Sequence, residues 1–128
     1  MNRIVLDASA ILAVISGEPG AEKLTPVLLA QAVGSAVNLA EVQTKLLSRG
    51  WNSEEAWEDA TSPVREVVAF DEEHARIAGD LVKQTKTLGL SLGDRACLAL
   101  GVALDCPVYT AEKAWKKIKL KVAVHVIR

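Results

Sequence analysis

Short apolar runs alternate along this chain with stretches in which apolar residues recur every three or four positions. The first run, residues 3–6, predicts a strand, and the helical pattern that follows it continues until Gly17. The same signals predict further helices at 21–31, 39–47, 53–63, 71–87 and 91–104, a helical turn at 112–117, and strands at 34–37, 65–70, 107–110 and 122–127. Strands that alternate with helices indicate an α/β fold with a parallel sheet covered on both faces.

Length and composition fit one compact domain over residues 1–128. The chain can bury one hydrophobic core, half of its residues are hydrophobic, and it has no linker, repeat or low-complexity stretch. The apolar run after Arg3 resembles an export signal, but Asp7 and Ser9 interrupt it, and no other run approaches membrane-spanning length. We therefore expect a cytoplasmic protein with no membrane partner.

Four acidic residues share one kind of position, because each follows a strand-like stretch or opens a helical one. They are Asp7, Glu41, Asp94 and Glu112. In an open parallel sheet, ligands bind at the carboxyl ends of the strands, where the chain turns into the next helix. Carboxylates gathered there repel one another and require a divalent cation. The pattern therefore predicts one shared metal site.

Each acid also has an ordinary structural explanation. Asn38 to Glu41 and Ser91 to Asp94 both match a capping box, in which the fourth side chain returns to the first backbone N–H. Asp7 and Glu112 are placed to stabilise the helix N-termini that follow them. Helix capping does not explain the recurrence of an acid at four such junctions. Asp94 also leads into the most apolar helix of the chain, where an unpaired carboxylate would be destabilised by desolvation.

Charge is distributed unevenly although the net charge is only −1. The segment from residue 111 to the end carries six Lys or Arg and one Glu, and the first 110 residues carry nine basic and fifteen acidic groups. The basic residues of this segment are Lys113, Lys116, Lys117, Lys119, Lys121 and Arg128. These side chains could bind the phosphate backbone of a nucleic acid next to Glu112. The alternative is an ordinary solvent-exposed surface of lysines.

Neither cysteine nor histidine chemistry is indicated. Cys97 and Cys106 lack CxxC spacing and are predicted to be reduced thiols in the core. His74 and His125 lie far apart, so the sequence contains no zinc or Ser-His-Asp constellation.

Four motifs in order resemble those of the PIN domain family, most closely the VapC-type ribonuclease toxins. The motifs are Val5-Leu-Asp-Ala-Ser-Ala, Asn38-Leu-Ala-Glu-Val, Leu90-Ser-Leu-Gly-Asp-Arg-Ala-Cys-Leu-Ala and Tyr109-Thr-Ala-Glu-Lys-Ala-Trp. The resemblance spans nearly the whole chain. It implies an α/β/α sandwich with a central parallel sheet, an endoribonuclease site that uses Mg²⁺ or Mn²⁺, an RNA substrate, a homodimer and a cognate antitoxin protein.

Carried over by residue, the resemblance implies that Asp7 and Asp94 hold the main metal and that Glu41 shares it or positions a water. Ser9, Asn38, Thr110 and Lys113 are expected to contact the metal ligands or the RNA. Glu112 departs from the family, where Asp is usual, and Mg²⁺ tolerates displaced ligands poorly. Glu112 is therefore expected to recruit a second ion or to act through water.

Two other function classes compete with this interpretation. A phosphoryl-transfer enzyme with Asp7 as nucleophile would carry a second Asp two residues later, where this chain has Ser9. A PIN-like RNA-binding module that has lost catalysis would explain Glu112 and the basic segment. The sequence does not identify the RNA target, since only five residues are aromatic and base stacking has few candidates.

Overall fold

A five-stranded parallel sheet forms the centre of the molecule, whose computed structural model describes residues 2–128. Its strands are β1 (Ile4–Leu6), β2 (Ala32–Ser35), β3 (Glu66–Val68), β4 (Val108–Thr110) and β5 (Val124–Val126). Their order across the sheet is β3-β2-β1-β4-β5, and all four pairings are parallel. The predicted parallel sheet is confirmed.

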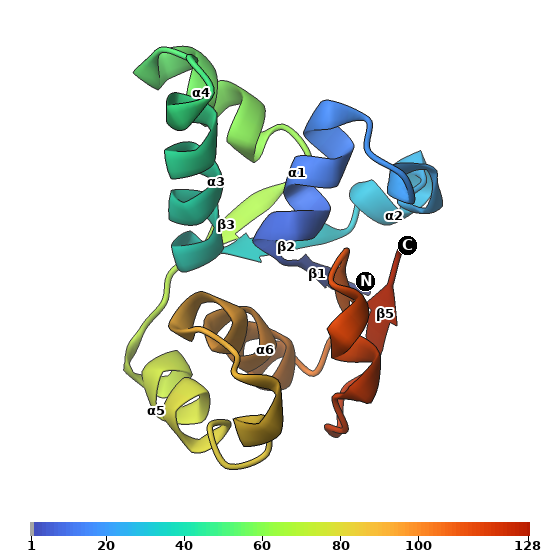
Figure 1. The fold of residues 1–128 in the computed structure, drawn as a ribbon, viewed down its shortest axis with the longest axis vertical. Helices are drawn as coiled ribbons and strands as arrows, with labels where there is room; N and C mark the ends of the chain where they lie inside the picture. Colours follow the sequence, from blue (N-terminus) through green and yellow to red (C-terminus); the bar gives the residue numbers. More distant parts are fainter. Residues whose placement is uncertain (1) are drawn as a thin grey trace.

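Helices cover both faces of this sheet, as Figure 1 shows. The α-helices are α1 (Ala8–Ser16), α2 (Pro26–Leu29), α3 (Ala36–Ser48), α4 (Ser53–Thr61), α5 (Glu72–Asp80) and α6 (Leu92–Leu104). Three 3₁₀ turns complete the described elements: η1 (Ala21–Lys23), η2 (Lys86–Leu88) and η3 (Lys113–Lys117). Helices α1 to α4 lie above the sheet in Figure 1 and α5 and α6 lie below it, so the predicted α/β/α sandwich is confirmed. Within residues 2–128, no helix has the length and apolar character needed to cross a membrane.

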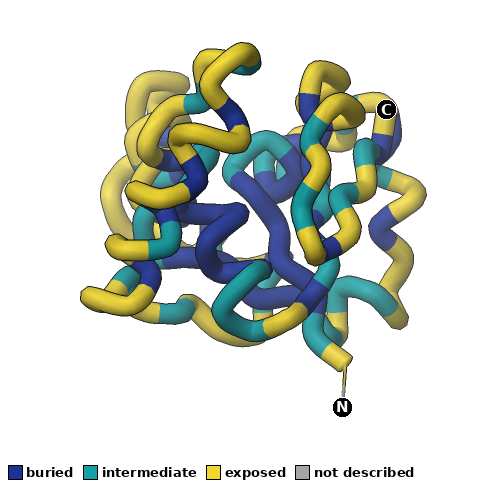
Figure 2. Tube along the Cα trace, turned by 90° about the horizontal axis from the view of Figure 1, so that it is seen from below, coloured by how far each residue is buried: buried dark blue, intermediate teal, exposed yellow. Residues whose placement is uncertain are grey.

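Two hydrophobic clusters lie on opposite faces of the sheet. Ile4 and Leu6 of β1 pack with α1, α3 and α4, whereas Val5 between them packs with α5 and α6. This alternation follows from the two-residue period of a strand, and burial on both faces explains why the strand sequences are almost wholly apolar. Figure 2 shows the buried segments in the middle of the molecule and exposed segments around them. Cys97 and Cys106 are free and buried, as predicted.

The strand order fixes where a ligand site can form. After β1, the chain places β2 on one side of β1 and β4 on the other, so the direction of winding reverses between β1 and β4. Clefts form at such a switch point, outside the carboxyl ends of the strands. Asp7 directly follows β1 and Thr110 is the last residue of β4, so both lie at this point.

The predicted helix at 21–31 is wrong, because the chain forms η1 and then the separate short helix α2. Pro26 has no backbone N–H to continue a helix, and Thr25 caps a new one by accepting a hydrogen bond from the Leu28 N–H at 3.3 Å. The stop predicted at Gly17 is confirmed, since Gly17 adopts φ 63° at the C-cap of α1.

Three other predicted boundaries are corrected. The strand predicted at 34–37 is Ala32–Ser35, because Ser35 already caps α3. Helix α4 is capped by Asn52, whose side chain reaches the Glu55 N–H, rather than by Ser53. Asp71 caps α5 as predicted, but α5 ends at Asp80 instead of near residue 87. Just after Asp80 the hydrogen bonds shorten to an i to i+3 pattern, in which the Val82 N–H donates to the Gly79 carbonyl.

Candidate metal-binding active site

Asp7 is the most constrained carboxylate of the predicted site. It is 3% exposed and caps α1, with Oδ1 accepting from the Ala10 N–H and the Ser9 hydroxyl, both at 2.8 Å. The hydroxyl of Thr110, at the end of β4, donates to Oδ2 at 2.6 Å. The capping role considered for Asp7 is therefore real, but one bond comes from a neighbouring strand and helps to anchor the carboxylate at the switch point.

The environment of Asp7 opposes its negative charge. The pKa of Asp7 is raised from its ordinary 3.8 to about 6. Burial raises it most, the hydrogen bonds from Thr110, Ala10 and Ser9 offset part of that increase, and the charge of Asp94 adds to it. The pKa of the buried Cys97 thiol is also raised, first by burial and then by the negative charges of Asp7, Asp94 and Glu41. The negative charges of these three acids therefore all act on the buried Cys97.

Asp94 belongs to the first turn of α6. Its Oδ2 accepts a hydrogen bond from the Ser91 N–H at 3.0 Å, and its own N–H donates to Ser91 Oγ at 3.2 Å. The predicted capping box at Ser91 to Asp94 is confirmed. Among the described residues, no hydrogen bond occupies Oδ1 of Asp94, so capping leaves one oxygen available to a cation.

Glu41 does not take part in the capping box predicted for it. Ser35 is the N-cap of α3, which places Asn38 and Glu41 inside the helix. The Asn38 amide instead donates to Glu41 Oε1 at 2.9 Å and to the Gly93 carbonyl at 3.0 Å. The buried Asn38 therefore connects α3 to α6 and restrains an exposed carboxylate, which is the supporting position expected for it.

Glu112 precedes η3 and its side chain makes no capping hydrogen bond. The Glu112 N–H donates to Thr110 Oγ1 at 3.0 Å, and the Ala111 N–H donates to Ser9 Oγ at 2.9 Å. The bond from Ala111 to Ser9 holds the segment after β4 against the start of α1, whereas the bond from Glu112 to Thr110 stays within the segment. The Glu112 side chain is exposed and free to rotate, unlike that of Asp7.

All four predicted acids and Ser9 line one open cleft with a volume of about 240 Å³. Its other lining residues are Ala8, Leu12 and Lys45. The predicted site residue Lys113 is exposed at the start of η3 and is not among the residues that line the cleft. Asn38 and Thr110 do not line the cleft either, but they donate hydrogen bonds to two acids that do, Glu41 and Asp7. Sequence reasoning missed Lys45, although its position four residues after Glu41 on a helix places both on one face.

Hard carboxylate oxygens in a cleft lined by four acids and one lysine suit Mg²⁺ or Mn²⁺. The spacing of the four acids is wide, however. Within residues 2–128, three ligand atoms come within 4.8 Å of one another only at Asp71, Glu73 and His74. That group lies at the first turn of α5, where Asp71 already accepts the capping bond from the His74 N–H. In the cleft, a cation would require rotation of the exposed Glu41 and Glu112 side chains or bridging waters.

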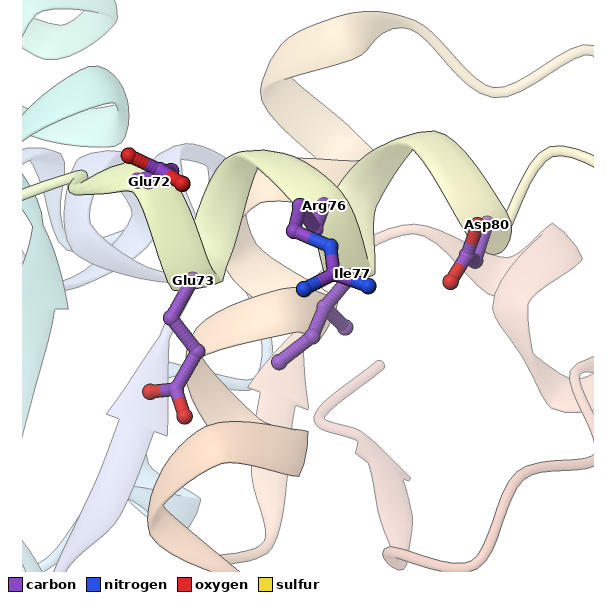
Figure 3. Close-up of a pocket in the computed structure, with 5 residues that line it drawn as sticks. All are labelled: Glu72, Glu73, Arg76, Ile77 and Asp80. Carbon is purple, nitrogen blue, oxygen red and sulfur yellow. The ribbon is translucent and has the colours of Figure 1, made fainter.

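A second hollow, of about 420 Å³, lies against α5 and is lined by Glu72, Glu73, Arg76, Ile77 and Asp80. All five side chains come from this one helix and do not converge on a common point (Figure 3). Glu72 and Glu73 stabilise the N-terminal turn of the helix through its dipole. The hollow therefore lacks the convergence of different elements that the cleft at Asp7 has.

The PIN domain family model matches residues 4–121, which include all four acids. The chain belongs to the PIN domain family. No curated protein sequence matches it. This PIN domain also shares its fold with solved structures of low sequence identity.

Three solved structures illustrate that similarity. VapBC2 of Rickettsia felis, bound to a promoter DNA fragment, has 17% identity and a TM-score of 0.73, with 98% of each chain covered. DNA-bound VapBC of Salmonella typhimurium has 14% identity and a TM-score of 0.75 over the full length of both chains. VapC20 of Mycobacterium tuberculosis, a Sarcin-Ricin loop cleaving toxin, has 17% identity and a TM-score of 0.66, covering 93% of this chain and 98% of that one. At these identities the similarity establishes the fold.

Gly93 gives this PIN domain a testable packing feature. A Cβ atom there would lie 2.6 Å from Cδ of Glu41 and overlap its carboxylate, so Gly93→Ala should push Glu41 away from Asn38. In an assay of the RNA cleavage that is proposed below, we expect activity to fall by about tenfold or more with stability little changed, because Ala favours a helix and the Glu side chain can move. Gly79→Ala in α5, which meets nothing within 4 Å, is the matched control and should leave cleavage unchanged. Equal activity of the two variants would contradict a role for the Glu41 position.

Proposed function

We propose that this protein is a metal-dependent endoribonuclease, the toxin of a type II toxin–antitoxin pair. The observation that carries the proposal is that Asp7, Glu41, Asp94 and Glu112, from four separate segments, line one cleft at the switch point of a PIN-family sheet. The VapC fold of the similar structures supports the toxin class.

Asp7 and Asp94 are the proposed principal metal ligands, with Glu41 beside them and Glu112 as a mobile ligand to a second ion or to a metal-held water. A divalent cation at this position neutralises phosphodiester charge and lowers the pKa of a water that attacks phosphorus. Ser9, Thr110 and the Ala10 N–H fix the Asp7 carboxylate, so its oxygens are oriented before any ligand arrives. Asn38 does the same for Glu41.

RNA is proposed to approach along the basic segment that follows Glu112. Five lysines of this segment, Lys113, Lys116, Lys117, Lys119 and Lys121, are exposed, which suits contact with a phosphate backbone. Trp115 within the segment is 2% exposed and packs in the core, so it is not available to stack on a base.

A homodimer and an antitoxin partner complete the proposal. Several similar structures contain VapBC or FitAB pairs, which supports a protein partner for this chain. The candidate docking region is α4, where Glu54, Glu55 and Glu58 are exposed and Trp57 is 44% exposed. Asp59 and Trp51 complete this region, and the Trp51 indole N–H donates a hydrogen bond to Asp59 Oδ2 at 2.6 Å. A basic side chain of the partner placed in the acidic cleft would replace the charge of the cation.

The test of the proposed function is cleavage of a mixed single-stranded RNA pool by the purified protein. We expect cleavage with Mn²⁺ or Mg²⁺, no cleavage after EDTA, and a rise in melting temperature of several degrees when Mn²⁺ is added to the metal-free protein. Undiminished cleavage in EDTA, with contaminating nuclease excluded, would contradict the mechanism. RNA binding without metal-dependent cleavage would favour the alternative of a PIN domain that only binds RNA.

A further inference from the structure

Lys45 is the only basic residue among those that line the acidic cleft within residues 2–128. It lies on α3, one turn after Glu41, and its side chain is exposed. Among the described residues, no ion pair within 4.0 Å joins Lys45 to a carboxylate, although an i, i+4 Glu–Lys pair is a favourable arrangement on a helix. Lys45 therefore lines the cleft without an ion pair to any of its carboxylates.

The charge balance of the cleft indicates what this ammonium group can do. With all four carboxylates ionised, the lining residues carry four negative charges and one positive charge. One divalent cation reduces this net charge from −3 to −1, whereas without Lys45 it would remain at −2. A phosphodiester brings another negative charge, so its entry is opposed more strongly when the lysine is absent.

Three features argue against a purely structural role for Lys45. The side chain is exposed, so it fills no core space, and among residues 2–128 it forms no ion pair within 4.0 Å that would restrain the acids. The helix beneath it is held by its own backbone bonds and by the buried residues Leu39, Val42 and Leu46. Removing the Lys45 side chain should therefore leave the fold intact.

We propose that Lys45 is a substrate-binding residue that donates to a phosphate oxygen of RNA held in the cleft. This inference rests on the proposed function. A lysine is suited to the task because its ammonium is a compact point charge on a flexible stem, able to reach a phosphate from a helix beside the metal ligands. Lys45 thereby provides an attractive contact on the α3 side of the cleft, opposite in charge to the neighbouring Glu41.

The experiment compares the wild type with Lys45→Met, Lys45→Arg and the control Lys23→Met. Lys23 is an exposed lysine in η1 outside the cleft, so its replacement measures the effect of lost charge alone. Cleavage of a short fluorescein-labelled single-stranded RNA in Mn²⁺ gives kcat/KM, and fluorescence anisotropy gives its binding. Isothermal titration with Mn²⁺ alone gives metal affinity without reference to activity.

We expect Lys45→Met to lower kcat/KM by about tenfold or more, Lys45→Arg to stay within about threefold of the wild type, and Lys23→Met to change it by less than about twofold. The salt dependence of RNA binding should decrease by about 0.7 in slope for Lys45→Met. Mn²⁺ affinity should stay equal or rise in Lys45→Met, because a positive charge has left the cleft.

A Lys45→Met protein that cleaves and binds RNA like Lys23→Met would overturn the inference while leaving the proposed function intact. Loss of Mn²⁺ affinity together with cleavage would also overturn it, because Lys45 would then support the metal ligands instead of the RNA. If the wild type does not cleave RNA, the proposed function fails. The inference about Lys45 is then tested by comparing RNA binding of the wild type and Lys45→Met by fluorescence anisotropy.

Discussion

Asp7→Asn is expected to lower metal-dependent RNA cleavage by more than about a hundredfold, because a neutral amide is a weak ligand for a hard cation. The same substitution should stabilise the metal-free protein at neutral pH. Asn caps a helix as well as Asp, so Oδ1 can keep its bonds from Ala10 and Ser9. The new amide can donate to Thr110, whose hydroxyl can turn toward Ser9 Oγ at 3.2 Å.

The pH dependence follows from the raised pKa of Asp7. The folded protein holds a proton on Asp7 up to about pH 6, whereas the unfolded chain releases it near 3.8, so the folded state binds more protons between these values. Stability must therefore fall as pH rises through this window, by up to about 3 kcal/mol for such a shift. Asp7→Asn should remove this component and melt higher than the wild type at neutral pH.

Asp71→Asn is the matched control for Asp7→Asn. Asp71 also caps a helix, through the bond from the His74 N–H at 3.0 Å, but it is exposed and lies outside the cleft. We expect its substitution to leave cleavage unchanged. Retained cleavage in Asp7→Asn would remove Asp7 from the proposed site, and lost cleavage in Asp71→Asn would show that a change at a helix cap alone abolishes activity.

Thr110→Val is expected to destabilise the metal-free protein by about 2 to 3 kcal/mol near pH 8, because it deletes a charge-assisted hydrogen bond to a buried carboxylate. Thr110 is fully buried, and its bond to Asp7 does more than the other hydrogen bonds to hold down the pKa of that carboxyl. Without it, the folded-state pKa of Asp7 should rise further above 3.8. The stability loss should therefore grow with pH and shrink to about 1 kcal/mol near pH 5, where Asp7 is protonated.

Urea denaturation at both pH values tests this expectation. Thr85→Val is the control, since Thr85 is also buried and its hydroxyl bonds to the Leu81 carbonyl at 2.8 Å, away from any buried acid. Its cost should not depend on pH. In the Asp7→Asn background, the cost of Thr110→Val should no longer depend on pH, since no buried charge remains. A Thr110→Val loss that is the same at both pH values would show that Asp7 is not the group Thr110 stabilises.

The sequence predicted the sheet and the cleft acids because both depend on local signals. Apolar runs bounded by turn residues predicted all five strands, and Asp7 and Glu112, which follow β1 and β4, lie close because these strands are parallel neighbours. The junction pattern was wrong for the other two acids, since Glu41 lies inside α3 and Asp94 follows η2, although both line the same cleft. The capping box at Ser91 was correct because its two bonds form within one turn. The similar pattern at Asn38 was wrong because Ser35, three residues earlier, ended its strand sooner and became the cap.

Features that depend on contacts between distant segments could not be predicted. The bond from Thr110 to Asp7 joins residues 103 positions apart, and the contact of Asn38 with the Gly93 carbonyl joins α3 to α6. Gly93 leaves room for the Glu41 carboxylate because it has no Cβ atom, and this contact depends on the same packing of α3 against α6. Lys45 had a local signal in its spacing from Glu41, but only the structure places its side chain in the cleft with the other acids.

Anomalous scattering from crystals grown with Mn²⁺ tests most directly whether the four acids form one metal site. We expect a Mn²⁺ peak in the cleft between Asp7 and Asp94, with Glu41 or Glu112 turned toward it, and no peak there in Asp7→Asn crystals. A peak only at the alternative ligand group, Asp71, Glu73 and His74, with none in the cleft, would contradict it.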